Sequence, residues 1–348
     1  MKRLVVVLAL LVVLVAGTLG FVFLSVAELL DRPVQGGPYR FTVASGSSLR
    51  QVLSELEERG AIERPAWIYY YARYRDMTGI RSGQYELKNN ETPRDLLTML
   101  ATGRVLNESF SIPEGYNRWQ IRDLLAAESW IEDEEFDALC DDKEFLQSEE
   151  IPGPSCEGYL FPETYRFARG VSARTIFKTM FAEFRRTVTG VREELGSGPL
   201  DLDPLKFATL ASIVEKETGA GEERPRIACV FYNRLRAQPE MRLQTDPTVI
   251  YAATLEDPEF DGNIRTYHLK ELRNPYNTYL NEGLPPGPIA SPGRAALRAV
   301  AQPSQCQDLF FVSMNNGRHV FCPTYECHLK NVQKWQVDYF RRKKNRER

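Results

Sequence analysis

An uninterrupted apolar stretch opens the chain and sets it apart from the more polar remainder. Residues 4–27 carry no charge and would, as one helix, cross the ~30 Å hydrocarbon core of a bilayer. Lys2 and Arg3 precede the stretch, and such cations favour the cytoplasmic side. The pattern predicts a cytoplasmic tail at 1–3 and a transmembrane helix at 4–27, with the rest of the chain outside. A cleaved signal peptide is the alternative, although its apolar core would span only ~7–15 residues.

A short series of strands and helices comes after a linker with prolines and glycines at residues 28–38. Strand-like alternation occurs at Tyr39–Val43 and Gly83–Leu87, and apolar residues at helical spacing lie between and after these segments. Thr92 is placed to cap the last of these helices. The strand–helix–helix–strand–helix order over residues 39–104 resembles a LysM-type sugar-binding module. A spacer domain with only a packing role is the alternative.

Longer helical patterns alternate with short strands over residues 105–340. Near the end, Leu309–Ser313 and His319–Phe321 alternate like strands around an Asn-Asn-Gly turn, which predicts a hairpin, and Lys330–Arg341 comes next as a helix. The chain is therefore expected to be α+β. It would contain a single transmembrane helix, a small LysM-like α/β module, a larger mixed α+β catalytic domain, and a solvated basic tail at 341–348.

Composition excludes one class of partner and bears on the redox environment. The net charge of −3 argues against a large basic face, so no nucleic acid partner is expected. All six cysteines lie beyond the apolar stretch, where an oxidising compartment would let them pair. Proximity favours Cys140–Cys156 and one pair among the last three cysteines, whereas Cys229 lies in an apolar helical pattern and is expected to be a small core residue. The scattered histidines and the absence of a Cys-x-x-Cys pair give no reason to expect a metal.

A candidate acid lies in the apolar helix that we expect at Phe207–Thr218. At 100° per residue the apolar side chains form one broad arc, and Glu217 points into it. Lys216 points to the far side, and Glu215 lies past the edge of the arc. A buried carboxyl is costly to ionise, so its pKa should rise, and a carboxyl protonated near neutral pH suits a general acid in sugar chemistry. The alternative is that both glutamates only end the helix, one solvated and one ion-paired.

Three further stretches carry notable polar and aromatic residues. Cys156–Tyr165 is dense in aromatic residues broken by Gly and Pro, which suits either a loop that stacks on sugar rings or a cover over a core. The helix after Glu217 carries Asn233 and Arg234, and a tight helical hairpin would bring both back toward that acid. Asp246 stands before a proline at a helix start, where we expect it to act as a cap.

Several long blocks of the chain, in order, resemble the YceG-like family of endolytic lytic transglycosylases, also called MltG. The matching blocks are Glu157–Tyr165, Ala211–Thr218, Val230–Leu235, Met241–Tyr251, Tyr276–Tyr279 and Gly283–Gly287, with His319, Phe321 and His328 echoing the last segment of the family. With the apolar helix and the LysM-like unit, the likeness covers nearly the whole chain. The cysteines are not part of the family's pattern.

The resemblance implies a membrane-held enzyme that cuts peptidoglycan strands internally, between N-acetylmuramic acid and N-acetylglucosamine. It implies a 1,6-anhydromuramic product, a role in ending nascent strands, and no cofactor, with peptidoglycan synthases as candidate partners. The family's catalytic glutamate falls on Glu217, which the apolar arc also indicates. The alternative is a protein without catalytic activity, a glycan-binding scaffold that links the membrane to the cell wall. A pyridoxal-phosphate lyase would need a lysine in an apolar pocket, and Lys216 faces away from the arc.

Six further residues in or near these blocks are candidate substrate contacts. They are Asn233, Gln244, Tyr276, Asn277, Tyr279 and Glu163. The amides can hydrogen-bond the N-acetyl and hydroxyl groups of a sugar, and the tyrosines can stack on its rings. For each of the amides and tyrosines a capping or turn role is the alternative. Glu163 is either a second acid in the cleft or an acceptor of hydrogen bonds within its loop.

Overall fold

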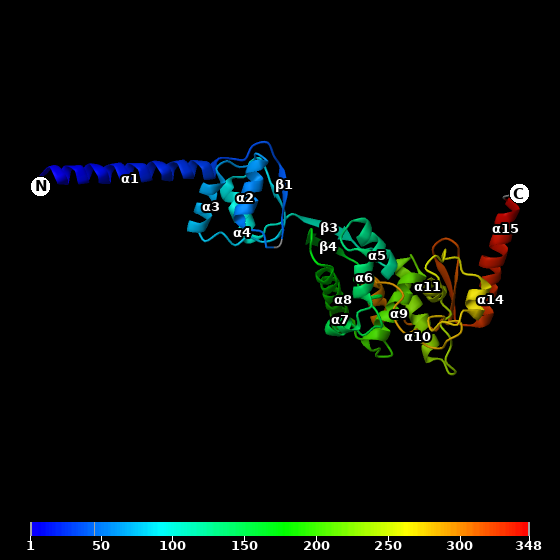
Figure 1. Ribbon diagram of the computed structural model, residues 1–348. Coiled ribbons are helices and arrows are strands. Elements are labelled where there is room, and N and C mark those ends of the chain that lie inside the picture. The colour runs from blue at the N-terminus through cyan, green and yellow to red at the C-terminus, as the bar shows by residue number, and fades with distance from the viewer. Residues whose placement is uncertain (1, 45, 347–348) are drawn as a thin grey trace. The chain divides into compact units, whose positions relative to one another are not determined.

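The computed structural model describes residues 2–44 and 46–346, which fall into two compact units (Figure 1). Unit 1 combines Met1–Ser109 with Arg166–Val171, and unit 2 combines Phe110–Tyr165 with Ser172–Arg348. The described residues mix helices with pairs of short strands, so the chain is α+β as expected.

Unit 1 contains the strand–helix–helix–strand–helix order that the sequence predicts. Its elements are α1 (Lys2–Asp31), β1 (Tyr39–Val43), α2 (Leu49–Glu58), α3 (Pro65–Tyr74), β2 (Gly83–Leu87) and α4 (Pro93–Thr102). β1 and β2 pair antiparallel, with Phe41 opposite Tyr85, and one face of the pair is buried against the helices. Capping boxes begin α2 at Ser48 and α4 at Thr92, because each side chain accepts a hydrogen bond from the third helical residue. The likeness to a LysM module stays a prediction.

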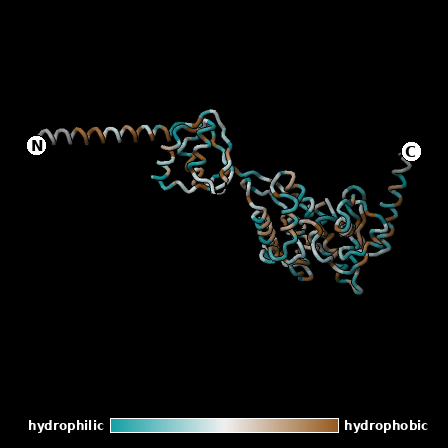
Figure 2. Tube along the Cα trace, in the orientation of Figure 1, coloured by the Kyte–Doolittle hydropathy of each residue, from teal (hydrophilic) through white to brown (hydrophobic). Residues whose placement is uncertain are grey.

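Helix α1 continues past the expected end of the apolar stretch. Figure 2 shows it as a largely hydrophobic helix, and Val13–Asp31 is long and apolar enough to cross a membrane, a test that a signal sequence also passes. Near its end and just beyond, Leu30 and Val34 are 1% and 4% exposed and belong to the hydrophobic core of unit 1. Residues 28–38, expected as a linker, therefore supply side chains to that core. These apolar groups gain more from joining the core than from remaining in solvent.

Unit 2 is mainly helical. Its elements, with two strands that extend into unit 1, are β3 (Asn107–Ser111), α5 (Arg118–Ala127), α6 (Asp133–Cys140), α7 (Lys143–Ser148), β4 (Thr164–Ala168), α8 (Ala173–Leu195), α9 (Pro204–Glu217), η1 (Gly221–Glu223), α10 (Arg224–Arg236), α11 (Asp246–Glu256), α12 (Thr266–Glu271), α13 (Arg294–Ala301), β5 (Phe310–Ser313), β6 (His319–Cys322), α14 (Tyr325–Val332), η2 (Gln333–Asp338) and α15 (Tyr339–Arg346). β3 pairs with β4, and β5 with β6. Helix α9 packs against α10, α11 and α13, and most of its residues are buried.

The C-terminal part of unit 2 agrees with the predicted hairpin and extends the predicted helix. β5 and β6 pair with Ser313 opposite His319, and Asn315 and Gly317 in the connecting turn both have positive φ. The helix begins earlier than Lys330, because the Thr324 hydroxyl caps it and starts α14 at Tyr325. It continues through a π-helical segment, η2, into α15. Residues 341–346 therefore belong to a helix, and the rest of the predicted basic tail lies outside the described residues.

All six cysteines form disulfides. Cys140–Cys156 confirms the pair expected from proximity, and Cys322–Cys327 confirms a pair among the last three cysteines. Cys229 lies in the core as predicted, but it is not a free cysteine, since it pairs with Cys306. Their separation of 77 residues hid this pair from any argument based on proximity. Next to this disulfide, the Asn233 amide on α10 donates to the backbone carbonyls of Cys306 (3.2 Å) and Asp308 (3.0 Å).

Candidate active site

Helix α9 presents Glu217 at its last turn. The helix begins with Pro204 at its first position, and the carboxylate of Asp203 accepts a 2.8 Å hydrogen bond from the Lys206 N–H. Its apolar residues are almost all inaccessible to solvent. At the other end Thr218 is extended and begins a turn, so the helix stops directly after Glu217. The carboxyl group is thus carried by a rigid, buried element but lies at its open end.

The surroundings of Glu217 raise its pKa from the ordinary value for a glutamate to about 7. Burial is the largest cause, because the ionised form loses hydration. The side chain of Thr245 opposes this rise, the Asp246 carboxylate adds to it, and the Arg234 guanidinium opposes it. Glu217 is still half-buried rather than fully enclosed. It can therefore hold a proton near neutral pH, as the apolar arc predicted, and its partial exposure leaves it accessible to a substrate.

The start of α11 supplies two of these neighbours. Thr245 is buried, and its hydroxyl makes no hydrogen bond of ordinary geometry among the described residues. Asp246 does not cap the helix as expected: it is the first helical residue, and its Oδ1 accepts a 2.6 Å hydrogen bond from the Tyr279 hydroxyl. Burial and this bond raise the pKa of Tyr279. The side chain of Asp246 thus turns toward Tyr279 and Glu217 rather than toward its own helix.

Arg234 is a buried cation beside Glu217, as the predicted helical hairpin required. It is 6% exposed, and its guanidinium donates to the carbonyls of Leu309 (Nε, 2.7 Å) and Leu243 (Nη1, 2.6 Å). Burial lowers the pKa of Arg234, while the charge of Glu217 opposes that shift. The guanidinium is held by neutral carbonyls, so its charge is available to stabilise the carboxylate form of Glu217.

Glu215 is buried more deeply than the sequence indicated. Its Oε1 forms a 2.6 Å ion pair with Arg224, and its Oε2 accepts a 3.0 Å hydrogen bond from the Gly293 N–H. The helical arc placed Glu215 outside the apolar face, but α10 and the loop before α13 cover that side of the helix as well. Lys216 between the two glutamates is exposed and donates to the Gly115 carbonyl at 3.0 Å. It points away from Glu217, as predicted.

The two candidate asparagines use their amides to hold loops. Asn277 is fully buried; its Nδ2 donates to the carbonyls of Leu272 (2.9 Å) and His268 (3.0 Å), and its Oδ1 accepts from the Tyr279 N–H. Asn233 is half-buried and tethers the Cys306 segment described above. These contacts agree with the turn and capping alternative.

The remaining candidates differ in how close they lie to Glu217. Tyr279 is half-buried and reaches the acid through Asp246. Gln244 has an exposed side chain and a left-handed backbone (φ 47°), next to Thr245. Tyr276 is half-buried on the loop that carries Tyr279. Glu163 is exposed, and its Oε1 accepts from the N–H of the next residue, the loop role that was one of its two alternatives.

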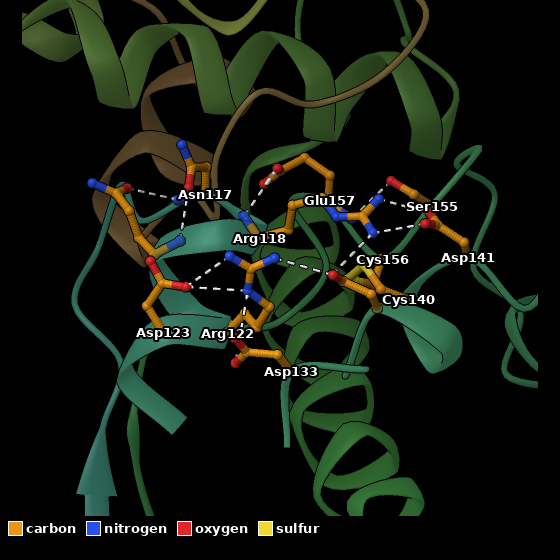
Figure 3. A network of polar contacts seen from close by, with 12 residues as sticks. Asn117, Arg118, Arg122, Asp123, Asp133, Cys140, Asp141, Ser155, Cys156 and Glu157 are labelled. Carbon is orange, nitrogen blue, oxygen red and sulfur yellow. Dashed lines mark hydrogen bonds and ion pairs between the residues drawn. A yellow bond between two sulfur atoms is a disulfide. The ribbon is translucent and has the colours of Figure 1, made fainter. Parts of the chain in front are cut away.

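Sequence reasoning missed a second buried carboxyl, that of Glu157. It is 3% exposed, and its Oε2 accepts a 3.0 Å hydrogen bond from the backbone N–H of Arg118 (Figure 3). The guanidinium of Arg118 instead bonds to Asp141 at 2.7 and 2.8 Å. Burial raises the pKa of Glu157 to about 7. Arg118 and the Tyr251 hydroxyl act against this rise, because both favour the ionised carboxylate. The only sequence signal was its position inside an aromatic, cysteine-linked segment.

Comparison with known proteins identifies the family. A family model described as the YceG-like family matches residues 41–334. The chain belongs to the YceG-like family. It is 32% identical over 310 residues to a Bacillus subtilis (strain 168) protein named endolytic murein transglycosylase, covering 84% of this chain and 83% of that protein.

Two further likenesses agree with this membership. A protein of the same name from Streptococcus pneumoniae serotype 2 (strain D39) is 29% identical over 325 residues, and the match covers 83% of this chain but 57% of that longer protein. A crystal structure of a yceG-like protein from Listeria monocytogenes is 33% identical, with a TM-score of 0.56, and covers 84% of this chain and 99% of that one. The resemblance seen in the sequence blocks is thereby confirmed.

Proposed function

We propose that this YceG-like protein is an endolytic lytic transglycosylase that cleaves peptidoglycan within its glycan strands. The observation that carries the proposal is the raised pKa of Glu217, about 7, at the accessible end of a buried helix. The names of the bacillar and pneumococcal relatives support the same reaction class. The bond cut would join N-acetylmuramic acid to N-acetylglucosamine, and the product would end in 1,6-anhydromuramic acid.

In the proposed reaction Glu217 acts first as an acid and then as a base. Its carboxyl proton passes to the glycosidic oxygen as the bond to the muramic anomeric carbon breaks. The resulting carboxylate takes the proton of the muramic 6-hydroxyl, whose oxygen bonds to that carbon and closes the anhydro ring. The proton therefore returns to Glu217, and no water is consumed. Attack from within the same sugar saves the entropy of bringing in a second reactant, and acid–base catalysis contributes about 10²–10⁴-fold.

The charges around Glu217 suit both halves of this cycle. Burial and Asp246 favour the protonated acid that starts the reaction, whereas Arg234 favours the carboxylate that forms once the leaving group is protonated. A group with a pKa near the working pH exchanges its proton most effectively in both directions. Asp246 is engaged by the Tyr279 hydroxyl, so we assign it to setting the pKa of Glu217 rather than to attack on the sugar.

The finer biological role extends this proposal. We infer that α1 is a retained single-pass anchor in the cytoplasmic membrane, with both units on the outer side, where the three disulfides are chemically stable. There the enzyme would end nascent glycan strands beside the synthases that make them, and unit 1 would bind glycan through its LysM-like module.

The test is digestion of purified peptidoglycan by the full chain in detergent, followed by mass spectrometry. Wild type should release fragments with anhydromuramic ends, and Glu217→Gln should release none while its unfolding temperature stays unchanged. Glu222→Gln, which alters an exposed carboxylate paired with Arg318 on the segment after α9, is the matched control and should retain activity. Anhydro product from Glu217→Gln would refute the assignment. Reducing ends in place of anhydro ends would indicate hydrolysis, and no product from wild type would favour the scaffold alternative.

A further inference from the structure

Three aromatic rings form a continuous strip in unit 2. The ring centroids of Trp119 and Tyr251 lie 5.4 Å apart, and those of Tyr251 and Tyr276 lie 4.9 Å apart. Tyr251, at the centre, is 5% exposed, whereas Trp119 and Tyr276 are half-buried. The two outer rings thus present part of their surface to solvent, and the central ring holds them together.

Two rings of the strip lie on elements that also supply neighbours of Glu217, and the third ring follows a segment that contacts the residue before Glu217. Tyr251 lies on α11 five residues after Asp246, which corresponds to about 7.5 Å along the helix axis. Tyr276 lies on the loop whose Tyr279 bonds to Asp246. Trp119 lies shortly after the segment in which the Gly115 carbonyl accepts a hydrogen bond from Lys216, the residue before Glu217. Two of the rings therefore lie on elements, α11 and the loop 276–279, that also carry Asp246 and Tyr279 beside Glu217.

The buried carboxyl of Glu157 supports the strip from inside. Its Oε2 accepts from the backbone N–H of Arg118, which precedes Trp119, its Oε1 has no hydrogen-bond partner among the described residues, and the Tyr251 hydroxyl is one of the groups that oppose the rise of its pKa. The charge of Glu157 also acts on Tyr276. A buried carboxyl such as that of Glu157 costs stability when it ionises, since it is removed from water. No step of the proposed reaction uses it.

We propose that the accessible parts of Trp119 and Tyr276, with Tyr251 packed between them, form a stacking subsite for a pyranose ring of the glycan strand beyond the two sugars that react, and that Glu157 is the positioning residue that fixes Tyr251. This inference rests on the proposed function of the same site. The C–H face of a pyranose is apolar and pairs with aromatic faces, while its hydroxyl groups stay in water at the rim. The occupant is a sugar of the same strand because α11 and the loop 276–279 carry both rings of the strip and neighbours of Glu217.

Binding is measured on the full chain in detergent carrying Glu217→Gln, so that no cleavage occurs. The probe is a glycan strand freed of its stem peptides, and its Kd is measured by isothermal titration calorimetry. Adding Trp119→Ala or Tyr276→Ala should raise Kd about tenfold. Tyr325→Ala, which removes an exposed ring from α14, is the matched control and should leave Kd unchanged. An equal Kd for the strip variants and the control overturns the subsite.

The same strip variants on the wild-type background separate this inference from the proposed function. Because the subsite is remote from the breaking bond, Trp119→Ala should raise KM about tenfold and leave kcat within about twofold. A fall in kcat with KM unchanged would overturn a binding role. If Glu217→Gln retained full activity, the mechanism would fail, but the measured Kd values would still decide whether the subsite exists.

The role of Glu157 needs a readout that a merely structural residue would not change. In the Glu217→Gln protein, Glu157→Ala should weaken glycan binding and shift the emission of Trp119, taken as the difference from a Trp119→Phe variant. The isosteric Glu157→Gln should restore both, since it keeps the shape and the acceptor. Normal binding and emission in Glu157→Ala, or no rescue by Glu157→Gln, would remove Glu157 from the proposal.

Discussion

Glu215 and Glu217 lie two residues apart at the end of α9 and have opposite surroundings. Glu215 is ion-paired with Arg224 at 2.6 Å, whereas Glu217 faces Thr245, Asp246 and Arg234 and has a pKa raised to about 7. Successive positions on a helix differ by about 100°, so these two carboxyls leave the helix on nearly opposite sides. The same helix end therefore carries Glu215, whose carboxylate is held in an ion pair, and Glu217, the proposed acid, in separate environments.

The first prediction concerns the pH dependence of cleavage. Because Glu217 must carry a proton to act as an acid, kcat/KM should fall as the pH rises through about 7. Asp246→Asn removes a negative charge that raises this pKa, so the falling limb should move to lower pH. Tyr279→Phe leaves that charge in place and should move the limb less. The measurement is the pH profile of kcat/KM, and a limb shifted upward in Asp246→Asn would contradict the assigned electrostatics.

The second prediction concerns the buried ion pair of α9. Glu215→Ala leaves the Arg224 guanidinium, whose side chain is 14% exposed, without its partner. Such a change should lower the free energy of unfolding by about 3 kcal/mol. Glu222→Ala breaks a pair with Arg318 in which both side chains are 62% exposed, and should cost under about 1 kcal/mol. Urea unfolding of both variants gives the comparison, and equal losses would show that burial does not set the difference.

The third prediction concerns Glu157 and stability at different pH. Its pKa in the folded protein, about 7, lies above that of an unfolded glutamate, so the folded state binds the proton more tightly. The resulting stability is complete below about pH 4 and is lost as the pH rises through about 7. Glu157→Gln cannot ionise and should be more stable than wild type at about pH 8, by up to about 3 kcal/mol, but not at about pH 4. A uniform effect at both values would argue against ionisation as the cause.

The fourth prediction compares two disulfides. Replacing Cys229 and Cys306 by alanine opens a loop with a sequence separation of 77, whereas replacing Cys322 and Cys327 opens one of 5. A cross-link stabilises mainly by restricting the unfolded chain, so the losses should be about 4 and about 2 kcal/mol. Thermal unfolding of each double variant provides the measurement. A larger loss from the short loop would mean that native contacts, not chain entropy, dominate.

Local patterns predicted the parts of this protein that depend on neighbours in sequence. The period of the apolar residues placed Glu217 on the buried side of its helix, and the structure finds its pKa raised by burial. The Asn-Asn-Gly turn predicted the hairpin of β5 and β6, because positive φ at Asn315 and Gly317 suits those residue types. Family membership was apparent from blocks that remain in order along the chain.

Features that depend on distant segments escaped the sequence. Nothing near Cys229 indicates Cys306, since that segment meets α10 from far along the chain. Glu215 was expected outside the apolar face because the helical arc describes one helix alone. Its burial comes from α10 and the loop before α13, which a single-helix pattern does not contain. Glu157 is buried by α5 and α11, so its raised pKa has no local signal. In each case a tertiary contact supplied information that periodicity does not contain.

The end of α1 has a mechanical consequence. Leu30 and Val34 lie in the core of unit 1, and Arg94 on α4 forms a 2.9 Å ion pair with Asp31 at the helix end. The long apolar helix is therefore rigidly joined to the folded body of unit 1 and is not connected to it by a flexible linker. Tilting or rotating the helix turns the β1–β2 ribbon with it, and lengthening the chain at residues 28–34 would break a core without extending its reach.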